Sequence, residues 1–214
     1  MSQVLDVIKI LDKDYPKPTI ALNYGNIFQL LVSVVLSAQC TDERVNKVTP
    51  ALFKRYPKVK DFAKANIEEL EKLIYSTGFY KNKAKNIKAA AEMICADFNE
   101  KVPDHMDNLL KLPGVARKTA NVILSAGFGK NEGIVVDTHV CRLSGRLGWV
   151  DMHLSKKKNA VKIENKLMEI IPKKDWGKIA YLLILHGRKI CVARKPKCKI
   201  CPLNKICPSA DISS

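Results

Sequence analysis

The sequence lacks long uninterrupted hydrophobic runs, low-complexity segments and clear internal repeats. Its longest apolar run, residues 30–38, is interrupted by serines and is too short to cross a lipid bilayer. We expect no signal peptide, because the first fourteen residues carry acids among apolar side chains and have no cleavage-type end, and we therefore expect a cytoplasmic protein. The alternating polar and apolar runs of a β-rich fold are also missing. These absences exclude membrane-spanning and predominantly β-sheet classes.

Acidic residues are scarce relative to basic ones. The 214 residues include 37 Lys and Arg but only 21 Asp and Glu, which gives a net charge of +16, and the hydrophobic content is 47%. A folded protein this basic usually binds a polyanion, and nucleic acid is the first candidate. A solvated cationic surface is the alternative. A membrane surface is less favoured, because neither end forms a basic amphipathic helix.

Most of the chain has the apolar periodicity of α-helices, which predicts an all-α protein. The clearest helical segments are residues 4–11, 27–36, 45–53, 67–74, 83–98, 161–171 and 176–185. The segment 27–36 is apolar nearly all round and predicts a central buried helix. Residues 134–136 are the only run compatible with a strand.

Local signals predict where several helices begin and end. Asn66 and Glu69 have the spacing of a capping box. Prolines are expected at or near helix ends, at Pro50, Pro57, Pro103, Pro113 and Pro172.

The seven cysteines fall into two groups. Cys40, Cys95 and Cys141 are scattered in apolar helical contexts and are expected to pack as small hydrophobic side chains. The other four, with the spacing C-x6-C-x2-C-x5-C, are Cys191, Cys198, Cys201 and Cys207. Thiols stay reduced in the cytoplasm, so this spacing predicts a metal site. Its single C-x2-C pair and wider gaps favour an iron–sulfur core over zinc and leave both open.

The loop between the first two of these cysteines is basic. Arg194, Lys195 and Lys197 lie in it. If both ends of the loop are held by a metal centre, these cations predict a DNA phosphate contact. A solvated turn is the alternative.

The stretch "LPGVARKTAN", residues 112–121, predicts a helix–hairpin–helix that binds the DNA backbone. Gly114 permits a tight turn with positive φ. Unpaired N–H groups at the start of the second helix can donate to a phosphate, a contact that carries no sequence information. An ordinary helix turn is the alternative.

Lys118 and Asp137 are the candidate catalytic residues. Only a neutral amine is nucleophilic, and a helix N-terminus, Arg117 and partial burial would each lower the pKa of Lys118. A phosphate-contacting lysine is the alternative. Asp137, in "VVDTHVCRL", is equally compatible with a helix cap and with a carboxylate that serves Lys118.

These residues together resemble the endonuclease III family, DNA glycosylases with AP-lyase activity in the helix–hairpin–helix superfamily. The resemblance runs from about residue 30 to residue 207, through "LLVSVVLSAQCTD", "GFYKNKAKNI", "LPGVARKTANVIL", "VDTHVCRL", "LILHGRKIC" and the four-cysteine tail. It implies a six-helix barrel domain over residues 21–131, with the helix–hairpin–helix at about 108–128. It also implies a [4Fe-4S] cluster domain over residues 1–20 and 132–214, with the cluster loop at 191–207.

The resemblance implies base excision repair. Lys118 is the expected nucleophile and Asp137 its carboxylate partner, in a reaction that excises oxidised pyrimidines through a Schiff base and cleaves the strand by β-elimination. The four clustered cysteines are the expected cluster ligands. The expected partner is double-stranded DNA with oxidised pyrimidines or abasic sites, bound by a monomer without any membrane.

The resemblance also implies which residues contact DNA. Gln39 and Phe79 are expected to fill the gap left by the flipped nucleotide, with Phe79 in an exposed loop where the family more usually has leucine. Asp42 is expected to face the damaged base or to cap a helix. The remaining expected DNA-contact residues are Gly114, Ala116, Arg117, Thr119, His139, Arg142, Arg194, Lys195 and Lys197.

Ala116 departs from the family pattern, because the hairpin usually reads Gly-Val-Gly and here reads Gly-Val-Ala. A positive φ at this position would cost alanine about 1 kcal/mol. We expect Ala116 to be the first helical residue instead, where alanine is unstrained.

Two other functions are compatible with parts of the pattern. An adenine-mismatch glycosylase shares the cluster and the aspartate but lacks a lysine nucleophile, so Lys118 argues against it. A non-catalytic DNA-binding protein could use the same hairpin, and the joint presence of Lys118 and Asp137 argues against that.

Overall fold

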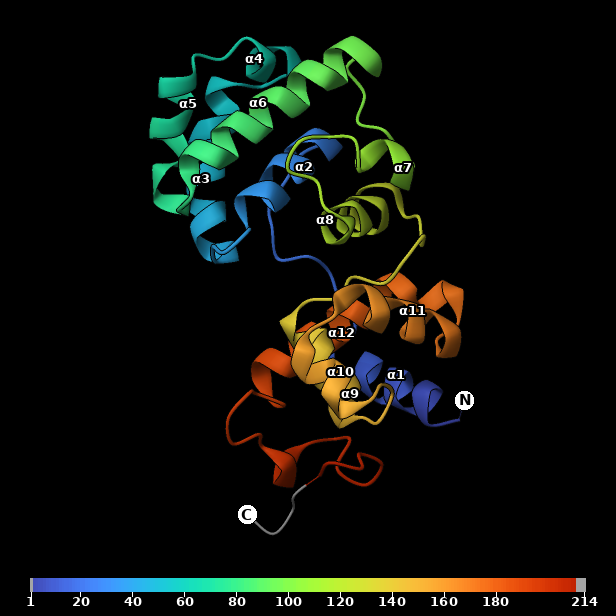
Figure 1. The fold of residues 1–214 in the computed structure, drawn as a ribbon. Helices are drawn as coiled ribbons and strands as arrows, with labels where there is room; N and C mark the ends of the chain where they lie inside the picture. The colour runs from blue at the N-terminus through green and yellow to red at the C-terminus, as the bar shows by residue number, and fades with distance from the viewer. Residues whose placement is uncertain (1, 211–214) are drawn as a thin grey trace. The chain divides into compact units, whose positions relative to one another are not determined.

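The computed structural model describes residues 2–210, and over that range it contains helices and connecting loops but no β-strand (Figure 1). The prediction of an all-α protein is confirmed. The chain forms two compact units, one of residues 21–130 and the other of the described parts of 1–20 and 131–214. None of the helices in the described range is long and apolar enough to cross a membrane.

The 21–130 unit contains seven α-helices over its described length. They are α2 (Ile27–Leu36), α3 (Asp42–Arg55), α4 (Val59–Ala63), α5 (Ile67–Ile74), α6 (Tyr80–Asp97), α7 (Met106–Leu109) and α8 (Arg117–Val122). A 3₁₀ turn, Tyr75–Thr77, precedes α6, and a π-helical segment, Ile123–Gly127, continues α8.

The other unit contains the first helix and the last four. They are α1 (Ser2–Asp14), α9 (Thr138–Arg146), α10 (Met152–Lys157), α11 (Ala160–Ile170) and α12 (Trp176–Lys189). Two 3₁₀ turns, Lys173–Asp175 and Cys198–Ile200, stand before and after α12.

Helix α2 is the buried helix of the 21–130 unit. Every residue from Leu30 to Leu36 is buried, as expected for a helix that is apolar all round. It packs against α3, α6 and α8. The side chain of Asn26 accepts a hydrogen bond from the N–H of Gln29 and so starts the helix at Ile27. The prediction of a central buried helix over 27–36 is confirmed.

Pro50 lies inside α3 and not at a helix end, so that expectation is wrong. A proline in a helix interior removes one backbone hydrogen bond and costs about 3 kcal/mol. Val45, Thr49 and Leu52 are buried along one face of α3 on both sides of the proline. Their packing outweighs the local preference and keeps the helix continuous.

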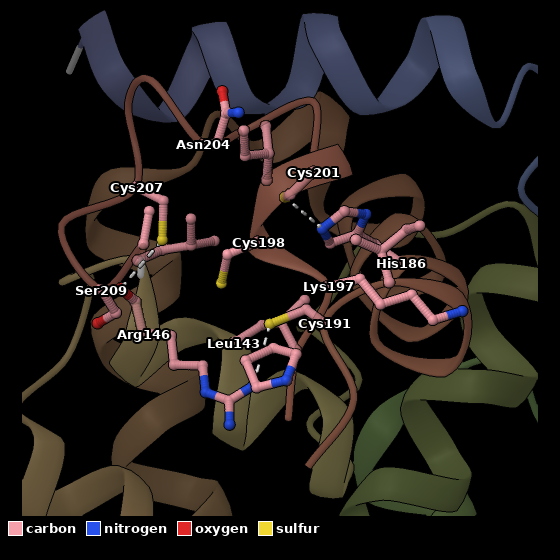
Figure 2. Close-up of a pocket in the computed structure, with 15 residues that line it drawn as sticks. Leu143, Arg146, His186, Cys191, Lys197, Cys198, Cys201, Asn204, Cys207 and Ser209 are labelled. Atoms are coloured by element: carbon pink, nitrogen blue, oxygen red, sulfur yellow. Dashed lines mark hydrogen bonds between the residues drawn. The ribbon is translucent and has the colours of Figure 1, made fainter. Parts of the chain in front are cut away.

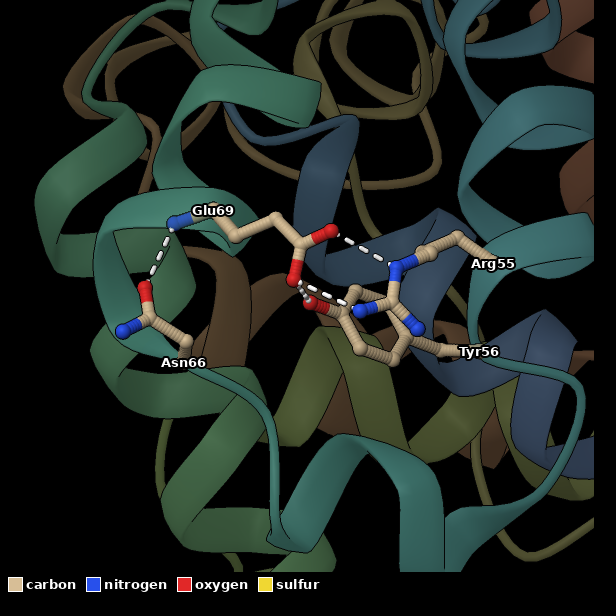
Figure 3. A network of polar contacts seen from close by, with 4 residues as sticks. All are labelled: Arg55, Tyr56, Asn66 and Glu69. Carbon is tan, nitrogen blue, oxygen red and sulfur yellow. Dashed lines mark hydrogen bonds and ion pairs between the residues drawn. The ribbon is translucent and has the colours of Figure 1, made fainter.

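Helix α6 packs along α4 and α5 (Figure 1), and the start of α5 corrects the predicted capping box. Asn66 does cap α5 by accepting from the N–H of Glu69 at 2.9 Å. The Glu69 carboxylate instead accepts two bonds from Arg55, at 2.6 and 2.9 Å, and one from the Tyr56 hydroxyl (Figure 3). A bidentate, charge-assisted pair is stronger than the reciprocal bond of a capping box. Arg55 and Tyr56 thereby hold the pKa of Glu69 below its usual value.

In the other unit, α12 packs against α1 and α9, and α9 also contacts α10 and α11. The run Ile134, Val135 and Val136 is buried at the entrance to α9. It belongs to no strand in the described range, so the one segment compatible with a strand is not one.

Candidate functional site

The segment between α7 and α8 is a tight hairpin. The N–H of Val115 donates to the carbonyl of Leu112 at 3.1 Å, and Gly114 has φ +79°. A Cβ at this position would lie 2.9 Å from the Cβ of Asn86, so both the backbone angle and the space require glycine. The expectation of a positive φ at Gly114 is confirmed.

Ala116 is unstrained but occupies a different position from the one expected. Its φ of −87° and ψ of 168° make it the N-cap of α8 and not the first helical residue. Its carbonyl accepts the N–H of Ala120 at 2.9 Å, and its methyl group supplies no capping oxygen. As a result, the N–H groups of Lys118 and Thr119 have no acceptor among residues 2–210.

Lys118 lies in the first turn of α8, and it is exposed. The expected partial burial of this residue is therefore wrong. The side chain projects from a helix start, and no hydrogen bond or ion pair engages its amine within the described range. An exposed amine without an internal partner can reach a ligand outside the protein.

Two exposed loops present Gln39 and Phe79. Gln39 follows α2 with φ +52°, and Phe79 caps α6 with φ +50° directly after Gly78. Phe79 is 62% exposed, which confirms that it stands in an exposed loop and not in the core. A positive φ is unusual for a bulky residue and marks positions where the surrounding structure imposes the conformation.

Asp42 is the first residue of α3 and is partly exposed. The cap of α3 is Thr41, whose hydroxyl accepts from the N–H of Arg44 at 3.2 Å. The alternative that Asp42 caps the helix is therefore wrong.

Asp137 is the N-cap of α9. Its Oδ1 accepts the N–H groups of both His139 and Val140, each at 2.8 Å. Its other oxygen, Oδ2, has no hydrogen-bond partner in the described range. The carboxylate is partly buried, so one oxygen is used by the helix and the other remains available.

Arg142 connects α9 to the end of α12. Its guanidinium donates to the carbonyls of Gly187 and Cys191, with the shortest bonds at 3.0 Å. Its Nη2 also lies 3.1 Å from Nδ1 of His139. Burial lowers the pKa of His139, and Arg142 and Arg188 lower it further against the opposing effect of Asp137. Nδ1 of His139 and the Arg142 guanidinium are thus engaged within their own unit.

The four clustered cysteines surround one hollow, and Figure 2 shows their side chains arranged around it. Its walls include Leu143, Leu147, Ile190 and Leu203. Burial raises the pKa of the Cys201 and Cys207 thiols. No three His, Cys, Asp or Glu side chains among residues 2–210 are placed to hold a single metal ion. Four separated thiols around a largely apolar hollow fit a multi-iron core better than one zinc ion.

Arg146, at the end of α9, holds the start of the cysteine segment. Its Nη1 donates to Sγ of Cys191 at 3.2 Å and to the carbonyl of Val192 at 2.8 Å, and its Nη2 donates to the carbonyl of Ala193 at 2.9 Å. The next cations along the chain, Arg194, Lys195 and Lys197, are exposed. The segment is therefore fixed at its base and presents a basic loop to solvent.

With this geometry described, the chain can be compared with known proteins. Residues 32–173 match HhH-GPD, described as HhH-GPD superfamily base excision DNA repair protein. The chain is 52% identical over 208 residues to the endonuclease III of Synechocystis, which covers 97% of this chain and 93% of that protein. The chain belongs to the endonuclease III family.

Two further endonuclease III proteins are similar to it. Identity to the endonuclease III of Bacillus subtilis is 45% over 196 residues, or 90% of this chain and 86% of that protein. A solved structure described as "Structure of a Trapped Endonuclease III-DNA Covalent Intermediate: Estranged-Adenine Complex" has a TM-score of 0.90 and 42% identity. It covers 98% of this chain and 96% of that chain.

In this endonuclease III family member, two cations hold distant backbone segments in place, and neither was predicted from the sequence. Arg146 appears in the sequence as an ordinary basic residue at a helix C-terminus, and Lys83 as one of many lysines. Both act on segments about 45 residues away in the chain, through contacts that only the folded protein creates.

Proposed function

We propose that this protein excises oxidised pyrimidines from duplex DNA and then cleaves the strand 3′ to the abasic site. The observation that carries the proposal is Lys118, an exposed amine without an internal partner, in the first turn after the hairpin. Family membership in base excision repair supports it. The related endonuclease III that was trapped in a covalent intermediate with DNA supports a covalent mechanism.

The chemistry begins when the damaged nucleotide leaves the base stack, because C1′ is inaccessible inside a duplex. Nζ of Lys118 forms a bond to C1′, the N-glycosidic bond breaks, and the base departs with a proton. The sugar ring then opens to a Schiff base between Lys118 and C1′. Loss of a C2′ proton breaks the C3′–O bond, so that the phosphate leaves by β-elimination.

Asp137 is the proposed carboxylate partner of Lys118. Its free Oδ2 can accept a proton from the lysine ammonium, and its negative charge stabilises positive charge that develops on the sugar. The hydrogen bonds from His139 and Val140 to Oδ1 orient the carboxylate for this role.

The DNA backbone is held at two basic elements in this proposal. At the hairpin, Gly114, Ala116, Arg117 and Thr119 contact one phosphate region through backbone N–H groups and side chains. Arg194, Lys195 and Lys197 contact another from the cysteine loop. DNA contacts by His139 and Arg142 stay predictions, since Nδ1 of His139 and the Arg142 guanidinium bond within the protein.

Two loops complete the site. Phe79 stacks into the gap left by the flipped nucleotide, and Gln39 bonds to the unpaired base on the opposite strand. Asp42 faces the damaged base. The exposed, left-handed positions of Gln39 and Phe79 support these roles.

The four thiolates of Cys191, Cys198, Cys201 and Cys207 are the proposed ligands of a [4Fe-4S] cluster. When bound, the cluster cross-links the loop that carries the three cations and so fixes their positions. We further propose that the protein acts as a monomer, and a cytoplasmic location stays a prediction.

Borohydride trapping tests the proposed function. The protein is mixed with a thymine glycol duplex, reduced, and examined for a covalent protein–DNA band. We expect the band in the wild-type protein and in a Lys54→Ala control, whose exposed lysine lies near the end of α3 outside the helix–hairpin–helix, but not in Lys118→Ala. Active wild-type protein without a band would indicate a monofunctional glycosylase. Absence of both band and cleavage would leave a DNA-binding protein without catalytic activity.

A further inference from the structure

Lys83 is a buried cation on α6, one turn after Phe79, with only 5% of its surface exposed. Its ammonium donates hydrogen bonds to the carbonyls of Leu36 and Thr77, each at 2.8 Å. Burial lowers the pKa of this amine, while Cys40 acts in the opposite direction. A buried ammonium is unfavourable unless hydrogen bonds compensate it, so the two carbonyls are the reason it can be there.

Both carbonyls belong to the ends of helical segments. Leu36 is the last residue of α2, and Thr77 is the last residue of the 3₁₀ turn before α6. Neither oxygen accepts a backbone N–H in the described range. Lys83 therefore satisfies two carbonyls that the backbone leaves unpaired.

Each of these carbonyls lies just before one of the exposed loops. Gln39 stands three residues after Leu36, and Phe79 stands two residues after Thr77. The backbone N–H of Lys83 also donates to the carbonyl of Phe79 at 3.1 Å. The Lys83 ammonium thus holds one carbonyl before each loop, and these two carbonyls lie 41 positions apart in the sequence.

We propose that Lys83 is a positioning residue that ties the Gln39 loop (residues 37–41) to the Phe79 loop (residues 78–79). Both side chains then enter the duplex as one preorganised unit. The inference rests on the proposed function, in which Gln39 and Phe79 occupy the gap left by one flipped nucleotide. Two loops that moved independently would have to be ordered during binding, which would reduce the fraction of productive complexes.

The left-handed conformations of Gln39 and Phe79 support this inference. Such backbone angles in residues other than glycine persist only where the surrounding structure imposes them. Both residues face solvent, so side-chain packing does not hold them. The bonds from Lys83 fix the backbone at Leu36, three residues before Gln39, and at Thr77, two residues before Phe79.

The test compares two substrates. A duplex with thymine glycol requires flipping and gap filling, whereas a single-stranded oligonucleotide with an abasic site requires only β-elimination. For Lys83→Met we expect single-turnover base excision from the duplex to slow by about tenfold or more. Cleavage of the single strand should stay within about twofold of the wild type.

Lys88→Met is the matched control. Lys88 lies on the same helix and also donates from Nζ to a backbone carbonyl, that of Ala65 at 2.9 Å, away from both loops. We expect it to behave as the wild type on both substrates. In a Gln39→Ala, Phe79→Ala background, Lys83→Met should have no further effect on duplex excision, because Lys83 acts through those side chains.

The outcomes separate this inference from the proposed function. Wild-type protein inactive on both substrates would overturn the proposed function. Active wild-type protein with an unchanged Lys83→Met variant, or a variant equally slowed on both substrates, would overturn only the positioning role. If Lys83→Met does not fold, Lys83→Gln replaces it, because its shorter side chain stays polar but reaches less far toward the carbonyls of Leu36 and Thr77, and the same slowing on the duplex alone is expected. If neither folds while Lys88→Met does, Lys83 serves fold stability and the inference is wrong.

Discussion

Asp137 Oδ1 accepts the backbone N–H of Val140 at 2.8 Å, and this bond makes the candidate catalytic carboxylate a helix cap as well. The two roles require different properties of one side chain. A cap needs only an acceptor oxygen, which asparagine also supplies. The proposed reaction needs a negative charge. Substitutions at this position can therefore separate them.

Asp137→Asn should fold normally and react poorly. Its free energy of unfolding should stay within a few tenths of a kcal/mol of the wild type, since Asn and Asp cap equally well. Single-turnover excision of thymine glycol should fall by about a hundredfold or more, because an electrostatic stabiliser is lost. Asp137→Ala should also lose the cap, and its free energy of unfolding should be about 1 kcal/mol lower than that of the wild type. Urea unfolding and excision kinetics on both variants measure this, and full activity of Asp137→Asn would refute the catalytic role.

Gly114→Ala should destabilise the protein more than Gly129→Ala. Both glycines have positive φ, +79° and +65°, so each substitution carries a conformational cost of about 1 kcal/mol. Only at Gly114 does the new Cβ meet another atom, the Cβ of Asn86 at 2.9 Å, while Gly129 has nothing within 4 Å. Only Gly114→Ala should also weaken binding to an abasic-site duplex. Unfolding and fluorescence anisotropy test the pair, and equal effects of the two substitutions would contradict the hairpin geometry.

Titration of Lys83 should make the free energy of unfolding depend on pH in the alkaline range. Burial lowers the pKa of Lys83 in the folded protein below its unfolded value of about 10.4. Between the two values the unfolded chain binds more protons, so the wild type gains stability as pH rises through this window. The neutral amine still has two N–H groups for the carbonyls of Leu36 and Thr77.

The measurement is urea unfolding of the wild type and Lys83→Met from about pH 8 to about pH 10. The free energy of unfolding of the wild type should rise relative to that of Lys83→Met as pH rises. Other titrating groups cancel in this difference, and Lys88→Met should run parallel to the wild type. A difference independent of pH would show that the pKa of Lys83 is not lowered.

The cysteine hollow should carry iron. We expect about four iron atoms and visible absorbance per purified wild-type chain, and loss of both in Cys198→Ala. Cys141→Ala is the control, because Cys141 is buried on α9 and does not line the hollow. Zinc in place of iron in protein purified without oxygen would overturn the cluster assignment.

The sequence predicted helices best where one strong local signal decided them. The α2 bounds follow from apolar periodicity alone, and those of α5 from apolar periodicity together with the cap Asn66. The helices α4, α7 and α10 have five, four and six residues, too few for a periodic pattern to emerge. The prediction of a helix end at Pro50 failed because the packing of its buried neighbours outweighs the local preference of proline.

The residues of the candidate site likewise fall into those that the local sequence predicts and those that depend on tertiary contacts. The hairpin turn at Gly114 and the four clustered cysteines were recognisable because their residue types and spacing carry the chemistry. Lys83 and Arg146 were not, since each bonds to groups 45 or more positions away. The exposure of Lys118 was also missed, because burial depends on the packing around α8 and not on its own sequence.

On the proposed function, the alanine at the start of α8 would link folding to DNA binding. Because Ala116 offers no side-chain oxygen, the first turn of α8 is incompletely capped in the free protein. In the proposed complex a DNA backbone phosphate would supply the missing acceptor, so that completing the helix would contribute to the binding free energy. A serine or aspartate at this position would stabilise the free protein and compete with the phosphate for the same N–H groups. On the proposed function, a residue that caps the isolated helix poorly would thus favour the DNA-bound protein.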